Sequence, residues 1–221
     1  MKLKKIASLM LAGIMAVSML AGCDGKGGSG EEENPVVPAE TGVVAYANDA
    51  LTADQKEVFT YAASADLDAI LKDLASSTSN FTKDKINTIY GQHKVTWDGT
   101  LAGKVDGKLS GLIAGNFNVA PKDGKSQKRG YVYTISGSLS EKEAVGMIAE
   151  SFGVDATTNS GNTDTLVCAS VVEYNKTKYD CAYSAEISAV KVSSSSAPNE
   201  SAWVVAIVLT QNLTKVSNTV A

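Results

Sequence analysis

The 221-residue sequence contains a single histidine, His93. Any Ser-His-Asp or Cys-His triad would have to use it, and a zinc site would need thiolates or carboxylates that nothing in the sequence places nearby. The HExxH, GxSxG and P-loop patterns of metalloproteases, serine hydrolases and phosphate-binding loops are also missing. We therefore expect no catalytic residues, no metal and no cofactor, and interpret His93 as a solvated residue at the entrance of a strand.

The apolar run at the start of the chain is too short to span a bilayer. Residues 6–20 are uncharged, which gives about 15 residues where a transmembrane helix needs roughly 20. The basic residues Lys2, Lys4 and Lys5 precede this run, and Leu20-Ala21-Gly22-Cys23 closes it. This order of a basic start, a short apolar run and small residues is typical of a secretory signal peptide.

The four residues from Leu20 to Cys23 resemble the lipobox of bacterial lipoproteins with a type II signal peptide. The resemblance implies that residues 1–22 are removed and that the Cys23 sulfur receives a diacylglycerol. Two or more acyl chains on one cysteine are enough for stable attachment to a membrane. We therefore expect an extracytoplasmic protein, lipid-anchored to the bacterial cell membrane. The alternative is an ordinary signal peptide followed by a cysteine without lipid.

The composition of the remaining chain predicts a tether and one domain. Residues 23–41 are rich in glycine, serine, acidic residues and proline, which cannot form a core, so we expect a flexible tether. Residues 42–221 are long enough for a single domain. Removing the three signal-peptide lysines leaves 17 basic side chains against 24 acidic ones, a net charge of −7. That balance argues against a nucleic-acid partner.

A glycine occupies every fourth position between Trp97 and Val119. Odd-numbered positions in this stretch are apolar or glycine, and such a period of two predicts strands. Lys104, Asp106 and Lys108 exclude a lipid-buried helix. We therefore predict a curled hairpin that turns at 104–108, with each bulky side chain opposite a glycine. Its concave side would pack on a helix or enclose a ligand, and its ligand-facing side chains would be Trp97, Leu101, Ile113 and Phe117.

Cys168 and Cys181 lie in two strand-like runs on either side of "NKTK". A hairpin across this segment would place both side chains on one face of the sheet. A disulfide would suit an oxidising exterior, and two buried thiols acting as small apolar residues are the alternative. Neither cysteine belongs to a CxxC pair or has a neighbouring histidine, so we expect no catalytic or metal-binding role.

The order of the remaining patterns predicts an α+β domain. N-terminal helices are expected from Thr52 to about Ser64, through Leu67–Leu74 and over 81–91, and a further helix is expected after the capping box at Ser140. The alternating segment over 131–139 and the two runs around the cysteines are expected to be strands. The segment over 202–213 is apolar on both faces, which predicts a central strand. Together with the 97–119 hairpin they form a mainly antiparallel curved sheet of about six strands, interrupted by one helix.

Three functions are compatible with these patterns. The first is an envelope-associated lipoprotein with a non-catalytic binding domain, whose partner could be a protein, a glycan or a lipid. The second is a carrier that holds an acyl chain or glycan on the concave face of the glycine-rich hairpin. The third is a cell-wall or glycan enzyme that uses two carboxylates.

Overall fold

The computed structural model describes residues 42–115, 117–118, 120–121, 126–152, 168–194 and 197–216. The predicted signal peptide, the lipidated Cys23 and the tether lie outside these ranges. The helices are α1 (Val43–Ala50), α2 (Ala53–Val58), α3 (Ala65–Ser76), α4 (Lys83–Tyr90), α5 (Gly99–Asp106) and α6 (Glu141–Ser151). The strands are β1 (Tyr61–Ala62), β2 (Thr96–Trp97), β3 (Leu112–Ile113), β4 (Gln127–Ser136), β5 (Val171–Tyr174), β6 (Thr177–Ser194) and β7 (Ala197–Lys215).

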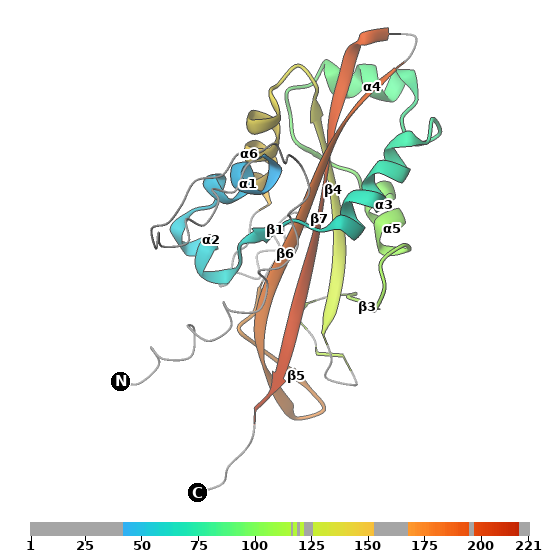
Figure 1. The fold of residues 1–221 in the computed structure, drawn as a ribbon. Helices are drawn as coiled ribbons and strands as arrows, with labels where there is room; N and C mark the ends of the chain where they lie inside the picture. Colours follow the sequence, from blue (N-terminus) through green and yellow to red (C-terminus); the bar gives the residue numbers. More distant parts are fainter. Residues whose placement is uncertain are drawn as a thin grey trace, which may run out of the picture. The chain divides into compact units, whose positions relative to one another are not determined.

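The strands form one mixed sheet in which β6 and β7 are the longest members (Figure 1). Its order is β1-β6-β7-β4-β2, with β5 also beside β6 and β3 beside β4. The β6–β7 and β4–β7 pairs are antiparallel, whereas the short β1–β6 and β3–β4 pairs are parallel. The predicted α+β class with a mainly antiparallel sheet is confirmed, with seven strands in place of about six and two short parallel pairs that make the sheet mixed.

Helices cover both faces of the sheet, and residue parity along β7 separates two cores. Odd-numbered side chains from 205 to 209 pack with α1 and α6, and even-numbered ones from 204 to 208 pack with α3, α4 and α5. All six are fully buried. Figure 1 shows the same division, with α1, α2 and α6 on one side of β7 and α3 and α5 on the other. The prediction that β7 is a central strand, apolar on both faces, is confirmed.

The helix starts predicted from capping residues are confirmed. Thr52 and Ser140 each form a complete capping box with the residue three positions later, Gln55 and Glu143. The first of these helices is shorter than predicted, because the chain becomes extended at Phe59 and forms β1. The amide of Asn48 fixes this change of direction by donating to the Tyr61 carbonyl (3.0 Å) and accepting from the Tyr61 N–H (2.8 Å).

The predicted hairpin over 97–119 is wrong, since most of its first half is helix α5. Asp98 caps this helix by accepting a hydrogen bond from the Leu101 N–H (2.9 Å), and its second carboxylate oxygen pairs with Lys85 (2.6 Å). The buried residues of α5 are Leu101, Ala102 and Val105, a helical spacing that coexists with the alternation at odd positions. Gly99, Gly103 and Gly107 lie on the exposed face of the helix.

Candidate functional site

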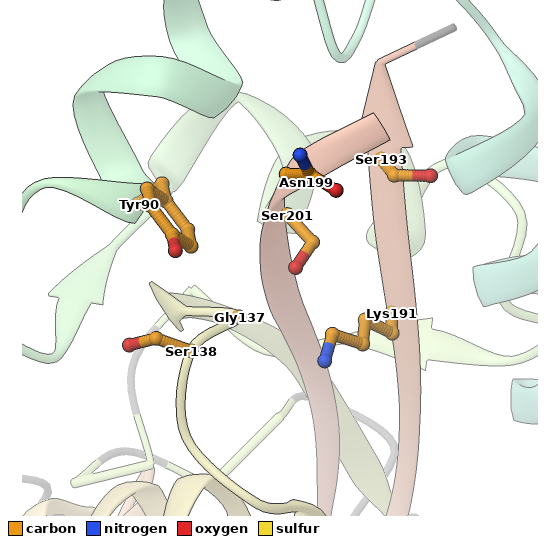
Figure 2. Close-up of a pocket in the computed structure, with 7 residues that line it drawn as sticks. All are labelled: Tyr90, Gly137, Ser138, Lys191, Ser193, Asn199 and Ser201. Carbon is orange, nitrogen blue, oxygen red and sulfur yellow. The ribbon is translucent and has the colours of Figure 1, made fainter. Parts of the chain in front are cut away.

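A shallow pocket of about 430 Å³ lies at the end of the sheet where β6 turns into β7 (Figure 2). We call it the turn-end pocket. Its residues come from four segments: the last residue of α4, the turn after β4, the end of β6 and the start of β7. They are Tyr90, Gly137, Ser138, Lys191, Ser193, Asn199 and Ser201.

Strand pairing and a tight turn bring these segments together. The Gly137 N–H donates to the Ser201 carbonyl (2.8 Å), which continues the β4–β7 ladder into the turn. A Cβ on Gly137 would collide with the hydroxyl and the backbone of Ser201, so this position has room only for glycine. The Ser136 hydroxyl donates to the Tyr90 carbonyl (2.8 Å) and thereby holds the end of α4 beside the turn.

Lys191 reaches the pocket from β6 across an indole ring. Its Nζ atom lies 5.3 Å from the centre of the Trp203 ring, a cation–π contact between directly paired strand residues. The Trp203 ring is fixed in turn, because its Nε1–H donates to the Leu139 carbonyl (3.0 Å). The ammonium group itself is solvent-exposed and stays available for a ligand, whereas the ring beneath it is rigidly held.

Three polar side chains face the same space without a partner from the protein. Figure 2 shows Lys191 and Ser201 pointing into the pocket from neighbouring strands, with Tyr90 bordering it from α4, whereas Ser193 turns away. Within the described part of the chain, no hydrogen bond or ion pair engages the Tyr90 hydroxyl, the Lys191 ammonium or the Ser201 hydroxyl. Ser201 is only 8% exposed. Its hydroxyl opens onto the pocket wall, where a ligand or water can supply the missing partner.

The four predicted ligand-facing residues do not share a surface. Leu101 packs in the core beneath α3, α4 and α5, and Phe117 packs in the core on the opposite face of the sheet. Trp97 is 50% exposed on β2, and Ile113 is half-buried on β3. The concave hairpin face that these residues were expected to form is therefore absent from the described part of the chain.

The predicted hairpin is confirmed for β5 and β6, and Cys181 lies on β6, whereas Cys168 precedes β5 and belongs to no strand. β5 and β6 join through Asn175 and Lys176, whose positive φ angles of 48° and 63° suit a two-residue turn. Cys168 and Cys181 are free thiols in the structure, Cys168 buried and Cys181 half-buried. Burial raises the pKa of Cys168 to about 12, with a smaller contribution from nearby Cys181, and burial also raises the pKa of Cys181.

We expect the two thiols to react at different rates. In the Cys23→Ala variant, a thiol-specific reagent at pH 8 should modify Cys181 at least about ten times faster than Cys168, because only a thiolate attacks and Cys168 is both buried and less acidic. Mass spectrometry of tryptic peptides over time would measure both rates. If neither thiol reacts until a reductant is added, the pair is a disulfide in solution.

Sequence reasoning missed the turn-end pocket because its residues carry no local motif. The β6–β7 register brings Lys191 and Ser201 together, and the hydrogen bond from Ser136 on β4 places Tyr90, which is distant in sequence, beside them. Within the described residues, no group of three or more histidine, cysteine, aspartate or glutamate side chains could hold a metal ion. No protein-family model matches the sequence, and neither a curated protein nor a solved structure matches it.

Proposed function

We propose that the protein is a membrane-anchored extracytoplasmic lipoprotein whose single domain binds a ligand without transforming it. The anchor is supported by the basic start, the short apolar run and the Leu20–Cys23 lipobox. In the described part of the chain, no helix has the length and apolar character needed to cross a membrane. The membrane would therefore be a partner through the lipid on Cys23.

The observation that carries the binding role is the set of unpartnered polar groups at the turn-end pocket. None of its seven residues is a histidine, a carboxylate or a cysteine, the groups that most often act as general acids, bases or thiol nucleophiles. Lysine can activate a serine in some hydrolases. Here no hydrogen bond joins Lys191 to Ser201 within the described residues, and Lys191 is exposed over Trp203. This arrangement favours recognition over catalysis.

The two other candidate functions have less support. The carrier of a hydrophobic ligand required the concave hairpin face, which the described residues do not form. The carboxylate enzyme required two acidic side chains facing one cleft. Glu143, a candidate for such a carboxylate, caps α6. Its carboxylate accepts hydrogen bonds from the Ser140 N–H (2.9 Å) and hydroxyl (2.7 Å).

The anchor is tested by labelling cells with radioactive palmitate. We expect the wild-type protein to incorporate label and to sediment with membranes, and the Cys23→Ala variant to incorporate none, because lipid is attached only at that sulfur. Cys181→Ala is a matched control that leaves the lipobox intact and should label normally. Equal labelling of the wild type and Cys23→Ala would contradict the proposal.

A further inference from the structure

We propose that the turn-end pocket binds the oxyanion, a phosphate or carboxylate, of a small ligand that also carries hydroxyl groups. This inference rests on the proposed binding function and names the ligand class for the same pocket. The argument comes from the charge of the lining residues, from the hydrogen-bond donors they leave free and from the way the protein holds them in place.

The lining residues give the pocket one positive charge and no negative charge. Lys191 is the only ionised side chain among the seven, and the others are hydroxyl, amide or glycine residues. A lysine ammonium is a compact point charge that suits phosphate and carboxylate oxygens. Because the protein as a whole is acidic, a local site with only a positive charge would attract an anion that the rest of the surface repels.

Hydroxyl donors adjoin this charge. Ser201 as a residue is more than nine-tenths buried, and its hydroxyl, which has no partner within the described residues, points into the pocket that Tyr90 borders from α4 (Figure 2). Lys191 and Ser201 can both donate to the oxygens of an oxyanion, and Tyr90 can donate to another oxygen of the same ligand. Asn199 and Ser138, also in the lining, can donate to and accept from ligand hydroxyls. A pocket of about 430 Å³ is within the size range of small-ligand sites.

The groups that hold the three donors are fixed before any ligand arrives. The Trp203 ring lies under the Lys191 ammonium group and is itself held by the Leu139 carbonyl. The absence of a side chain at Gly137 leaves room for Ser201, and the hydrogen bond from Ser136 holds the end of α4 that carries Tyr90. Preorganised donors lower the entropic cost of binding, which supports a specific site over a chance cluster on the surface.

Trp203 also provides a built-in probe. The chain has two tryptophans, so Trp97→Phe leaves Trp203, in contact with Lys191, as the single fluorescent indole. The full mature chain from Cys23 onward would be titrated in a polyoxyethylene detergent, because a maltoside detergent carries competing hydroxyls. The ligands tested are glycerol 3-phosphate, glycerate, inorganic phosphate and, as an uncharged control, glycerol. Glycerol 3-phosphate and glycerate distinguish the two oxyanions, and inorganic phosphate shows what the hydroxyl groups add.

We expect a saturable change of Trp203 fluorescence with glycerol 3-phosphate, glycerate or both, with a dissociation constant of about 1 mM or lower, and no change with glycerol. Lys191→Gln and Ser201→Ala should each weaken binding at least about tenfold, the effect of losing one charge-assisted hydrogen bond. Lys191→Arg should retain most of the affinity. Lys178→Gln removes the same charge from an exposed position near the other end of β6 and should bind like the wild type.

Calorimetric titration of the same proteins measures binding without the indole, because Lys191→Gln also changes the surroundings of Trp203. Unchanged unfolding midpoints would show that the variants are folded. Equal binding by Lys191→Gln and the wild type, binding of glycerol as tight as that of its phosphate, or no saturable binding of either anion would overturn the inference. Palmitate labelling of Cys23 tests the anchor separately, so loss of anion binding and loss of anchoring are distinguishable.

Discussion

Gln211→Ala is expected to lower the free energy of unfolding by about 3–5 kcal/mol, because it leaves several buried polar groups without a partner. Gln211 is fully buried near the far end of β7 from the turn-end pocket. Its amide nitrogen donates to the Phe117 carbonyl and the Tyr183 hydroxyl, both at 2.8 Å, and its amide oxygen accepts from Gln127 (2.7 Å). The Tyr183 hydroxyl donates onward to the Ala169 carbonyl (2.9 Å).

Urea unfolding followed by circular dichroism would measure this loss. Asn212→Ala is the matched control on the adjacent residue, since Asn212 is exposed and its oxygen accepts only an exposed hydrogen bond from Ser126 (2.9 Å). It should cost less than about 1 kcal/mol. If Gln211→Ala and Asn212→Ala were equally mild, the buried amide network would contribute little to the stability of the fold.

Alanine substitutions at Gly103 and Gly130 are expected to change stability in opposite directions. At Gly103, on the exposed face of α5, an added Cβ meets nothing within 4 Å, and the helix gains about 0.5–1 kcal/mol from the better propensity of alanine. At Gly130 an added Cβ would lie 2.7 Å from a methyl carbon of Val105 and 3.1 Å from the Asp106 carboxylate. Forcing α5 away from β4 should cost about 1–3 kcal/mol.

The same urea experiment measures both effects. Gly130 also donates its N–H to Asp106 (2.6 Å), so Asp106→Asn separates the loss of this charge-assisted bond from the effect of crowding. The sign of the stability change in Gly103→Ala distinguishes helix α5 from the strand hairpin that the alternating pattern predicts. In a strand paired with another glycine-rich strand, Gly103→Ala would lack the helical gain, and a destabilised Gly103→Ala variant would contradict helix α5.

Strong local signals allowed much of the fold to be predicted from the sequence. The capping boxes at Thr52 and Ser140 form as expected, and the alternation over 131–139 places Tyr131, Tyr133 and Ile135 in one core. The stripe through Leu67, Leu71 and Leu74 is the buried face of α3. In each case the local pattern and the tertiary contacts favour the same structure.

The prediction failed where two periods fit the same residues. In the 97–119 stretch the apolar side chains at 101, 105 and 109 fit both a strand face and a helix face, and the glycines favour neither. Asp98 decided the outcome by capping the helix, and its partly buried ion pair with Lys85 reinforced it. Short β1 and β3 have two residues each, too few for any periodic signal. The turn-end pocket was unpredictable for a related reason, because its donors meet only through pairings of distant segments.

The two amides between β4 and β7 have a consequence for how these strands align. From Val204 to Leu209, β7 presents aliphatic side chains to both cores. A shift of the strand pairing by one residue would therefore replace one aliphatic set by another at small cost. Hydrophobicity alone leaves the alignment of β7 weakly determined. Gln211 removes that freedom. After such a shift its amide would move to the opposite face of β7, where half-buried Thr210 and exposed Asn212 now lie, and would lose Gln127, the Phe117 carbonyl and the Tyr183 hydroxyl. One pair of polar side chains thus selects a single alignment for a strand that would otherwise have two.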